Sequence, residues 1–175
     1  MKFELKAISP GGIPHAIAKA ERYRFLNEPE EAESICRDIL AVEPENQMAL
    51  RLLGLCITDQ FTGQSSDRYS EAGEAFQKLS DNYERLYYTG VLLERRAKAQ
   101  LSAGPLPHVV AVRFEEAMRY FDEAASMRPK GNDDALLRWN RCARLLETLP
   151  EEERGRELEF ESADIPPPQV SRARR

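Results

Sequence analysis

Apolar residues recur three and four positions apart along most of this chain, the spacing that places them on one face of an α-helix. The clearest stripe consists of Ala32, Ile35, Cys36, Ile39 and Leu40. Stripes of this kind predict helices over 14–26, 82–101, 108–127 and 133–149, and three shorter helices that carry Ala32–Leu40, Leu50–Ile57 and Ala72–Leu79. The predicted fold class is all-α.

Turn-forming residues divide the chain into an N-terminal arm at 1–13, a helical array at 14–149 and a tail at 150–175. The apolar residues of the arm, Phe3, Leu5 and Ile8, are expected to pad the first helix pair. The tail is acidic at first and then rich in proline and arginine, so disorder is expected from about residue 160. It is either a solvated extension or a short peptide that binds a partner or the chain itself.

Three helices share one spacing, in which an alanine precedes a larger core residue by four positions. The occurrences are Ala32-x3-Cys36…Pro44, Ala72-x3-Phe76 and Ala117-x3-Phe121…Pro129. Two other helices carry a second pattern, in Leu50-x2-Leu53-Gly54-x2-Ile57 and Trp139-x2-Cys142-Ala143-x2-Leu146. Together these patterns resemble the tetratricopeptide repeat, a helix–turn–helix unit of about 34 residues.

The small residues of both patterns are expected to let neighbouring helices approach closely. Gly54 is predicted to face Ala72 across such a contact, while larger side chains such as Phe76 fill the space beside it. Pro44 and Pro129 cannot continue a helix, so each should end one helix before the next begins.

The resemblance implies a right-handed superhelical array of about three helix pairs plus a capping helix. Its concave groove would be lined by the first helix of each pair. Residues that lie clear of the apolar stripes of those helices are Arg24, Arg51, Leu55, Tyr87, Val91, Glu94, Asn140 and Arg144. Arginine forks bind carboxylates well, so an extended acidic peptide is the predicted ligand; alternatively, these arginines are ordinary solvent-facing charges.

One known function of the family is disfavoured. Members that bind chaperone tails place a lysine and an asparagine on the first helix, where they clamp a C-terminal carboxylate. The matching positions here are Ile17 and Glu21, so that clamp is absent. The most basic stretch is instead 138–144, where Trp139 is expected to seal the end of the core.

Composition and motifs exclude several classes of chemistry. The net charge of −5 disfavours nonspecific nucleic-acid binding, and the longest apolar runs are too short to span a bilayer. The three cysteines each lie on an apolar stripe and should be reduced core residues of a cytosolic protein. We find no phosphate loop, no nucleophile elbow and no metal-ligand spacing, so neither a cofactor nor a metal is expected.

The sequence therefore predicts a non-enzymatic, cytoplasmic module that binds a protein or peptide in its groove. Two alternatives remain open. The chain could be a structural subunit that self-associates through the long helix pair at 83–127, or a small helical enzyme or regulatory subunit.

Overall fold

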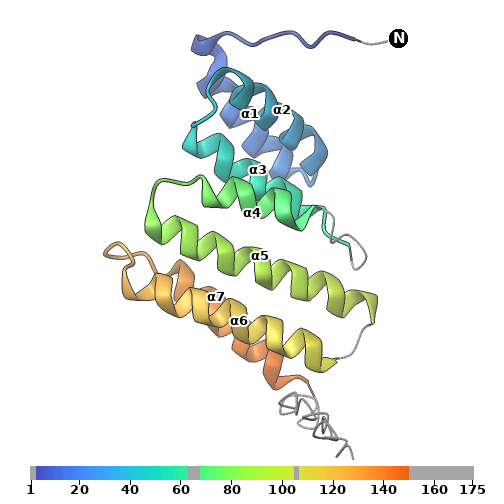
Figure 1. The fold of residues 1–175 in the computed structure, drawn as a ribbon, viewed down its shortest axis with the longest axis vertical. Helices are drawn as coiled ribbons and strands as arrows, with labels where there is room; N and C mark the ends of the chain where they lie inside the picture. The colour runs from blue at the N-terminus through green and yellow to red at the C-terminus, as the bar shows by residue number, and fades with distance from the viewer. Residues whose placement is uncertain (1–2, 63–67, 105–106, 150–175) are drawn as a thin grey trace, which may run out of the picture.

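A computed structural model describes residues 3–62, 68–104 and 107–149 (Figure 1). The helices of this part are α1 (Ile13–Phe25), α2 (Pro29–Val42), α3 (Gln47–Asp59), α4 (Tyr69–Gln77), α5 (Asn82–Ala103), α6 (Pro107–Ser126) and α7 (Asp134–Glu147). A short 3-10 turn, Pro10–Gly12, precedes α1, and the described ranges contain no strand. The predicted all-α class is confirmed. The tail predicted at 150–175 lies outside the described residues.

The helices are stacked along the long axis of the molecule, with α1 and α2 at one end and α6 and α7 at the other (Figure 1). Each helix packs against the next along the chain, and contacts also join α1 to α3, α3 to α5 and α5 to α7. We call these four helices the odd-helix layer. Because its members touch one another in a row, side chains from distant parts of the sequence share one surface.

Local sequence explains where the helices begin and end. The side chains of Asn46 and Asp81 accept hydrogen bonds from backbone N–H groups three residues later, at 3.0 Å each, and so cap α3 and α5. Gly104, at φ 81°, ends α5 in the left-handed conformation that glycine tolerates best. At the start of α7 the carboxamide oxygen of Asn132 accepts from the N–H of Asp134 at 3.0 Å, whereas Asp133 makes no side-chain cap.

Aromatic rings of the even-numbered helices lie against glycines of the odd-helix layer. A Cβ atom placed on Gly54 would lie 2.6 Å from Cζ of Phe76, and one on Gly90 would lie 2.6 Å from Cε1 of Phe121. The three atoms nearest to such a Cβ on Gly54 all belong to the ring of Phe76, which lies one turn along α4 from Ala72, the residue predicted to face this glycine. The small residue accommodates a large partner rather than another small one.

The N-terminal arm packs against the first helix pair only in part. Ile8 is half-buried and packs with Ile13 of α1 and Ile39 of α2. Phe3 and Leu5 are instead 81% and 87% exposed. The prediction that all three cover the helix pair is correct only for Ile8, since the residues before it extend away from the array (Figure 1).

Candidate binding surface on the odd-helix layer

The turn after α1 holds two large apolar side chains in solvent. The N–H of Glu28 donates to the carbonyl of Tyr23 at 2.9 Å, and the N–H of Asn27 donates to the carbonyl of Arg24 at 3.1 Å. With Asn27 at φ 61°, these two bonds form a Schellman motif, in which asparagine tolerates the left-handed conformation. The turn is fixed by its backbone, and Phe25, just before it, is 91% exposed.

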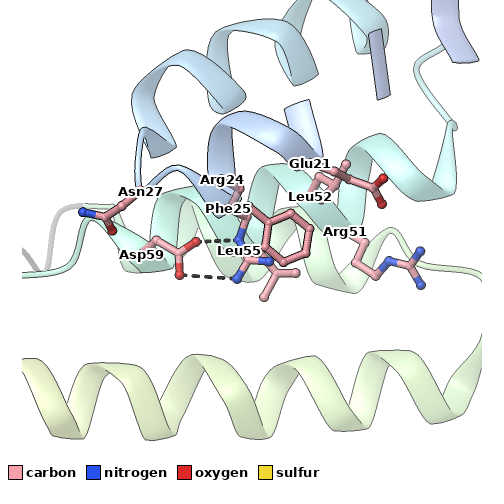
Figure 2. Close-up of a pocket in the computed structure, with 8 residues that line it drawn as sticks. All are labelled: Glu21, Arg24, Phe25, Asn27, Arg51, Leu52, Leu55 and Asp59. Carbon is pink, nitrogen blue, oxygen red and sulfur yellow. Dashed lines mark hydrogen bonds and ion pairs between the residues drawn. The ribbon is translucent and has the colours of Figure 1, made fainter. Parts of the chain in front are cut away.

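A hollow of about 530 Å³ lies beside Phe25, between α1 and α3. It is lined by Glu21, Arg24, Phe25, Asn27, Arg51, Leu52, Leu55 and Asp59 (Figure 2). In Figure 2 the ring of Phe25 lies near Leu55, with Arg24 and Asp59 on one side and Arg51 on the other. The structure thus brings together three of the predicted groove residues, Arg24, Arg51 and Leu55.

Arg24 is paired with a carboxylate of its own chain. Its Nε donates to Oδ2 of Asp59 on α3 at 2.5 Å, and Oδ1 of the same carboxylate lies 2.5 Å from Nη1 of Arg95 on α5. Arg95 also donates to the carbonyl of Leu55 at 3.0 Å and to the hydroxyl of Thr58 at 2.5 Å. Asp59 therefore joins three helices of the odd-helix layer through two arginines.

Arg51 is paired in the same manner. Its Nη1 donates to Oε1 of Glu84 on α5 at 2.7 Å, and its other guanidinium nitrogen contacts the sulfur of Met48. About a quarter of each charged side chain remains exposed. Arg24 and Arg51 thus line the hollow with their charges already neutralised, which leaves less positive potential for an acidic ligand than the sequence predicts.

Glu94 does not face a groove. Its side chain is fully buried, where it accepts from Nη1 of Arg138 on α7 at 3.0 Å and is ion-paired with Lys98 one turn along α5. The prediction that Glu94 lies clear of the core is wrong, and Val91 is fully buried as well. Burial of an ionised carboxylate is costly unless it is paired. The Glu94 carboxylate therefore holds α7 against α5 rather than binding a ligand.

The other predicted groove residues lie apart from the hollow. Tyr87 is half-buried in an aromatic cluster, with ring centroids 5.0 Å from Tyr88 and 6.0 Å from Phe121. Asn140 and Arg144 are exposed on α7, at the other end of the layer from α1. The structure does not gather the predicted residues into one site.

Sequence reasoning missed Phe25 and Asp59. An aromatic residue at the end of an amphipathic helix usually belongs to the core, so the apolar pattern alone would place Phe25 inside. The signal that could have corrected this is Asn27: an asparagine two residues on indicates a left-handed cap, after which the last helical side chains need not face the neighbouring helix.

A second polar cluster joins α2, α3 and α4. The nearly buried carboxylate of Glu33 accepts from Arg37 at 2.7 Å, from Arg68 at 2.6 Å and from Gln60 at 2.7 Å, and both arginines also pair with Glu71. Burial favours the protonated acid, but the hydrogen bonds from Arg68, Arg37 and Gln60 outweigh it and lower the pKa of Glu33 to about 2. Because its arginines, its carboxylates and Gln60 bind one another across three helices, this cluster ties α2, α3 and α4 together.

Among the residues that the structure describes, no three His, Cys, Asp or Glu side chains are placed to hold a metal ion, and no helix that these residues form has the length and apolarity to cross a bilayer. Cys36, Cys56 and Cys142 are unbridged and buried, and burial raises the pKa of Cys142 to about 12, which keeps the thiol protonated. No protein-family model, curated protein or solved structure matches the chain.

Proposed function

We propose that this chain is a non-enzymatic interaction module, with a tetratricopeptide-like array, that binds a segment of a partner protein on its odd-helix layer. The observation that carries the proposal is Phe25, which is 91% exposed beside a hollow of about 530 Å³. A large aromatic side chain held in water by a fixed turn is typical of an interface anchor. The contacts of α1, α3, α5 and α7 in one row support an extended surface around it.

The lining of the hollow indicates what such a segment would present. Phe25 and Leu55 supply apolar surface, while Arg24 and Arg51 are held by internal carboxylates. An apolar side chain of the partner would remove this surface from water at about 25 cal/mol per Å². The exposed polar edge at Asn27 would meet the backbone of the segment. The proposed ligand is thus anchored by an apolar residue, with carboxylates of secondary importance.

The test compares two exposed apolar residues at opposite ends of the molecule. Phe25→Ser removes the anchor, whereas Leu137→Ser on α7 removes a side chain that is 64% exposed and distant from the hollow. Proteins retained from a native lysate by the wild-type chain are identified, and the affinity of each is measured for both variants. Loss of an anchor should weaken binding roughly thirtyfold for Phe25→Ser alone. Equal binding by both variants and wild type would contradict the proposal.

A further inference from the structure

The outer face of α1, away from the hollow at Phe25, carries three exposed basic residues in one row. His15, Lys19 and Arg22 are four and three positions apart, so their side chains follow one another along the helix. They line a second hollow of about 470 Å³, whose remaining lining residues are Ala18, Tyr23 and Leu26. We call this set of six residues the α1 basic face.

The cations of the α1 basic face differ from the arginines of the interior. Arg24, Arg51 and Arg138 each have a carboxylate partner on another helix. In the described part of the chain, no carboxylate pairs with Lys19 or Arg22, and Lys19 lies over the ring of Tyr23 at 5.7 Å. Because the chain as a whole carries a net charge of −5, this basic row is not a consequence of overall composition.

The α1 basic face also has apolar surface. Leu26 is 61% exposed at the end of the row, and Ala18 and the half-buried Tyr23 line the same hollow as the basic side chains. A ligand that satisfied the whole face would combine carboxylates with at least one large apolar side chain. Inorganic anions and polyphosphates supply negative charge but no apolar side chain.

The chain itself contains a segment with this composition. Residues 151–164 hold seven carboxylates against two arginines, and Leu158 and Phe160 alternate with Glu157, Glu159 and Glu161. The described chain ends at Leu149, two residues before this segment begins, at the end of the molecule away from α1 (Figure 1). The α1 basic face and the point from which the acidic segment continues therefore lie at opposite ends of one molecule.

We infer that residues 151–164 of one copy bind the α1 basic face of a second copy. Carboxylates of the segment would pair with Lys19 and Arg22, while Leu158 or Phe160 would cover Leu26. Such a contact joins unlike surfaces, so copies associate head to tail, into closed rings or open chains, and the mass of the assemblies grows with concentration. It uses neither Phe25 nor its hollow, so it stands or falls independently of the proposed function.

The nearest competing site is on α7. Arg141 and Arg144 are exposed on the helix that directly precedes the acidic segment, and binding there would occur within one molecule. Leu137, four residues before Arg141, is exposed there as Leu26 is on α1, so the α1 basic face is favoured by its third basic side chain and by its hollow. The two arginines of α7 nevertheless provide the matched control, because reversing them changes the net charge by the same amount as reversing Lys19 and Arg22.

The experiment is sedimentation velocity of the full chain from micromolar to millimolar concentration, at low and high salt. We expect the weight-average mass of the wild type to rise with concentration and to fall when salt is added. Lys19→Glu/Arg22→Glu should weaken association about tenfold or more, whereas Arg141→Glu/Arg144→Glu should leave it close to wild type. Circular dichroism of each variant verifies that the helices are retained.

A charge exchange separates a specific contact from a general effect of net charge. Glu157→Lys/Glu159→Lys alone should also abolish association. The chain with all four substitutions, Lys19→Glu/Arg22→Glu/Glu157→Lys/Glu159→Lys, should regain it, since both partners are then reversed. A wild type that stays monomeric at millimolar concentration, association lost through the α7 variant instead, or failure of the exchange to restore assembly would each overturn the inference.

Discussion

The ring of Phe76 on α4 lies directly against Gly54 on α3, where a Cβ atom would come within 2.6 Å of Cζ. The same relationship recurs between Phe121 on α6 and Gly90 on α5. In each case the glycine of one helix admits an aromatic side chain of the next, which allows the two helices to approach closely. The recurrence gives two successive helix pairs the same interface.

We predict that Gly54→Ala destabilises the protein by about 1–3 kcal/mol, because the ring of Phe76 is fully buried and has no space to withdraw. The matched control is Gly73→Ala on α4, where the added Cβ would meet only Leu92 Cδ2, at 3.4 Å. That variant should be neutral or more stable by about 0.5–1 kcal/mol, the usual gain of replacing glycine in a helix. Urea denaturation measures both; equal stabilities of the two variants would refute the close contact.

We predict a clear loss of stability when the Asp59 carboxylate, which pairs with both Arg24 and Arg95, is removed. Asp59→Ala leaves the largely buried guanidinium of Arg95 without its carboxylate and frees Arg24, so we expect a loss of about 1–3 kcal/mol in the free energy of unfolding. Asp133→Ala breaks an exposed ion pair with Arg128 and should cost less than about 1 kcal/mol. If thermal unfolding showed the same small effect for both variants, Asp59 would not be joining the odd-helix layer.

We predict that the stability contributed by the Glu33 carboxylate is lost in acid. Its pKa is lowered from the ordinary 4.5 to about 2, so its contribution to stability is complete above pH 4.5 and disappears as the pH falls toward 2. Glu33→Gln should therefore be less stable than wild type at neutral pH, and the difference should shrink between these two pH values. Denaturant titrations at several pH values measure it, with the exposed Glu74→Gln as control. A difference that stays constant across this range would contradict the assignment.

The helices could be predicted from the sequence because their apolar stripes and turn residues act locally. The stripes at Ala32–Leu40 and Leu50–Ile57 both lie within helices of the structure, and the long α5 and α6 appear where the pattern indicates them. Helical spacing and caps are determined by residues within a turn or two, so one sequence suffices to locate them.

The site could not be predicted to the same extent, because ion pairing joins residues far apart in the chain. The spacing that places Arg51 clear of the apolar stripe is correct, but nothing local indicates that Glu84, 33 residues later, would neutralise it. Glu94 also lies at a position that looks exposed, and its burial depends on Arg138, 44 residues away. Partner choice across helices is set by tertiary packing, which periodicity does not encode.

Site-specific photo-crosslinking most directly tests the proposal that a partner protein docks beside Phe25. A benzophenone amino acid placed at position 25 should yield a crosslinked adduct in a native lysate. The same probe at position 112 reports on Val112, which is 51% exposed on α6, outside the odd-helix layer. We predict an adduct of defined mass from position 25 that is absent from position 112 and is suppressed by Leu55→Arg. Equal labelling from both positions, or none from position 25, would contradict the account.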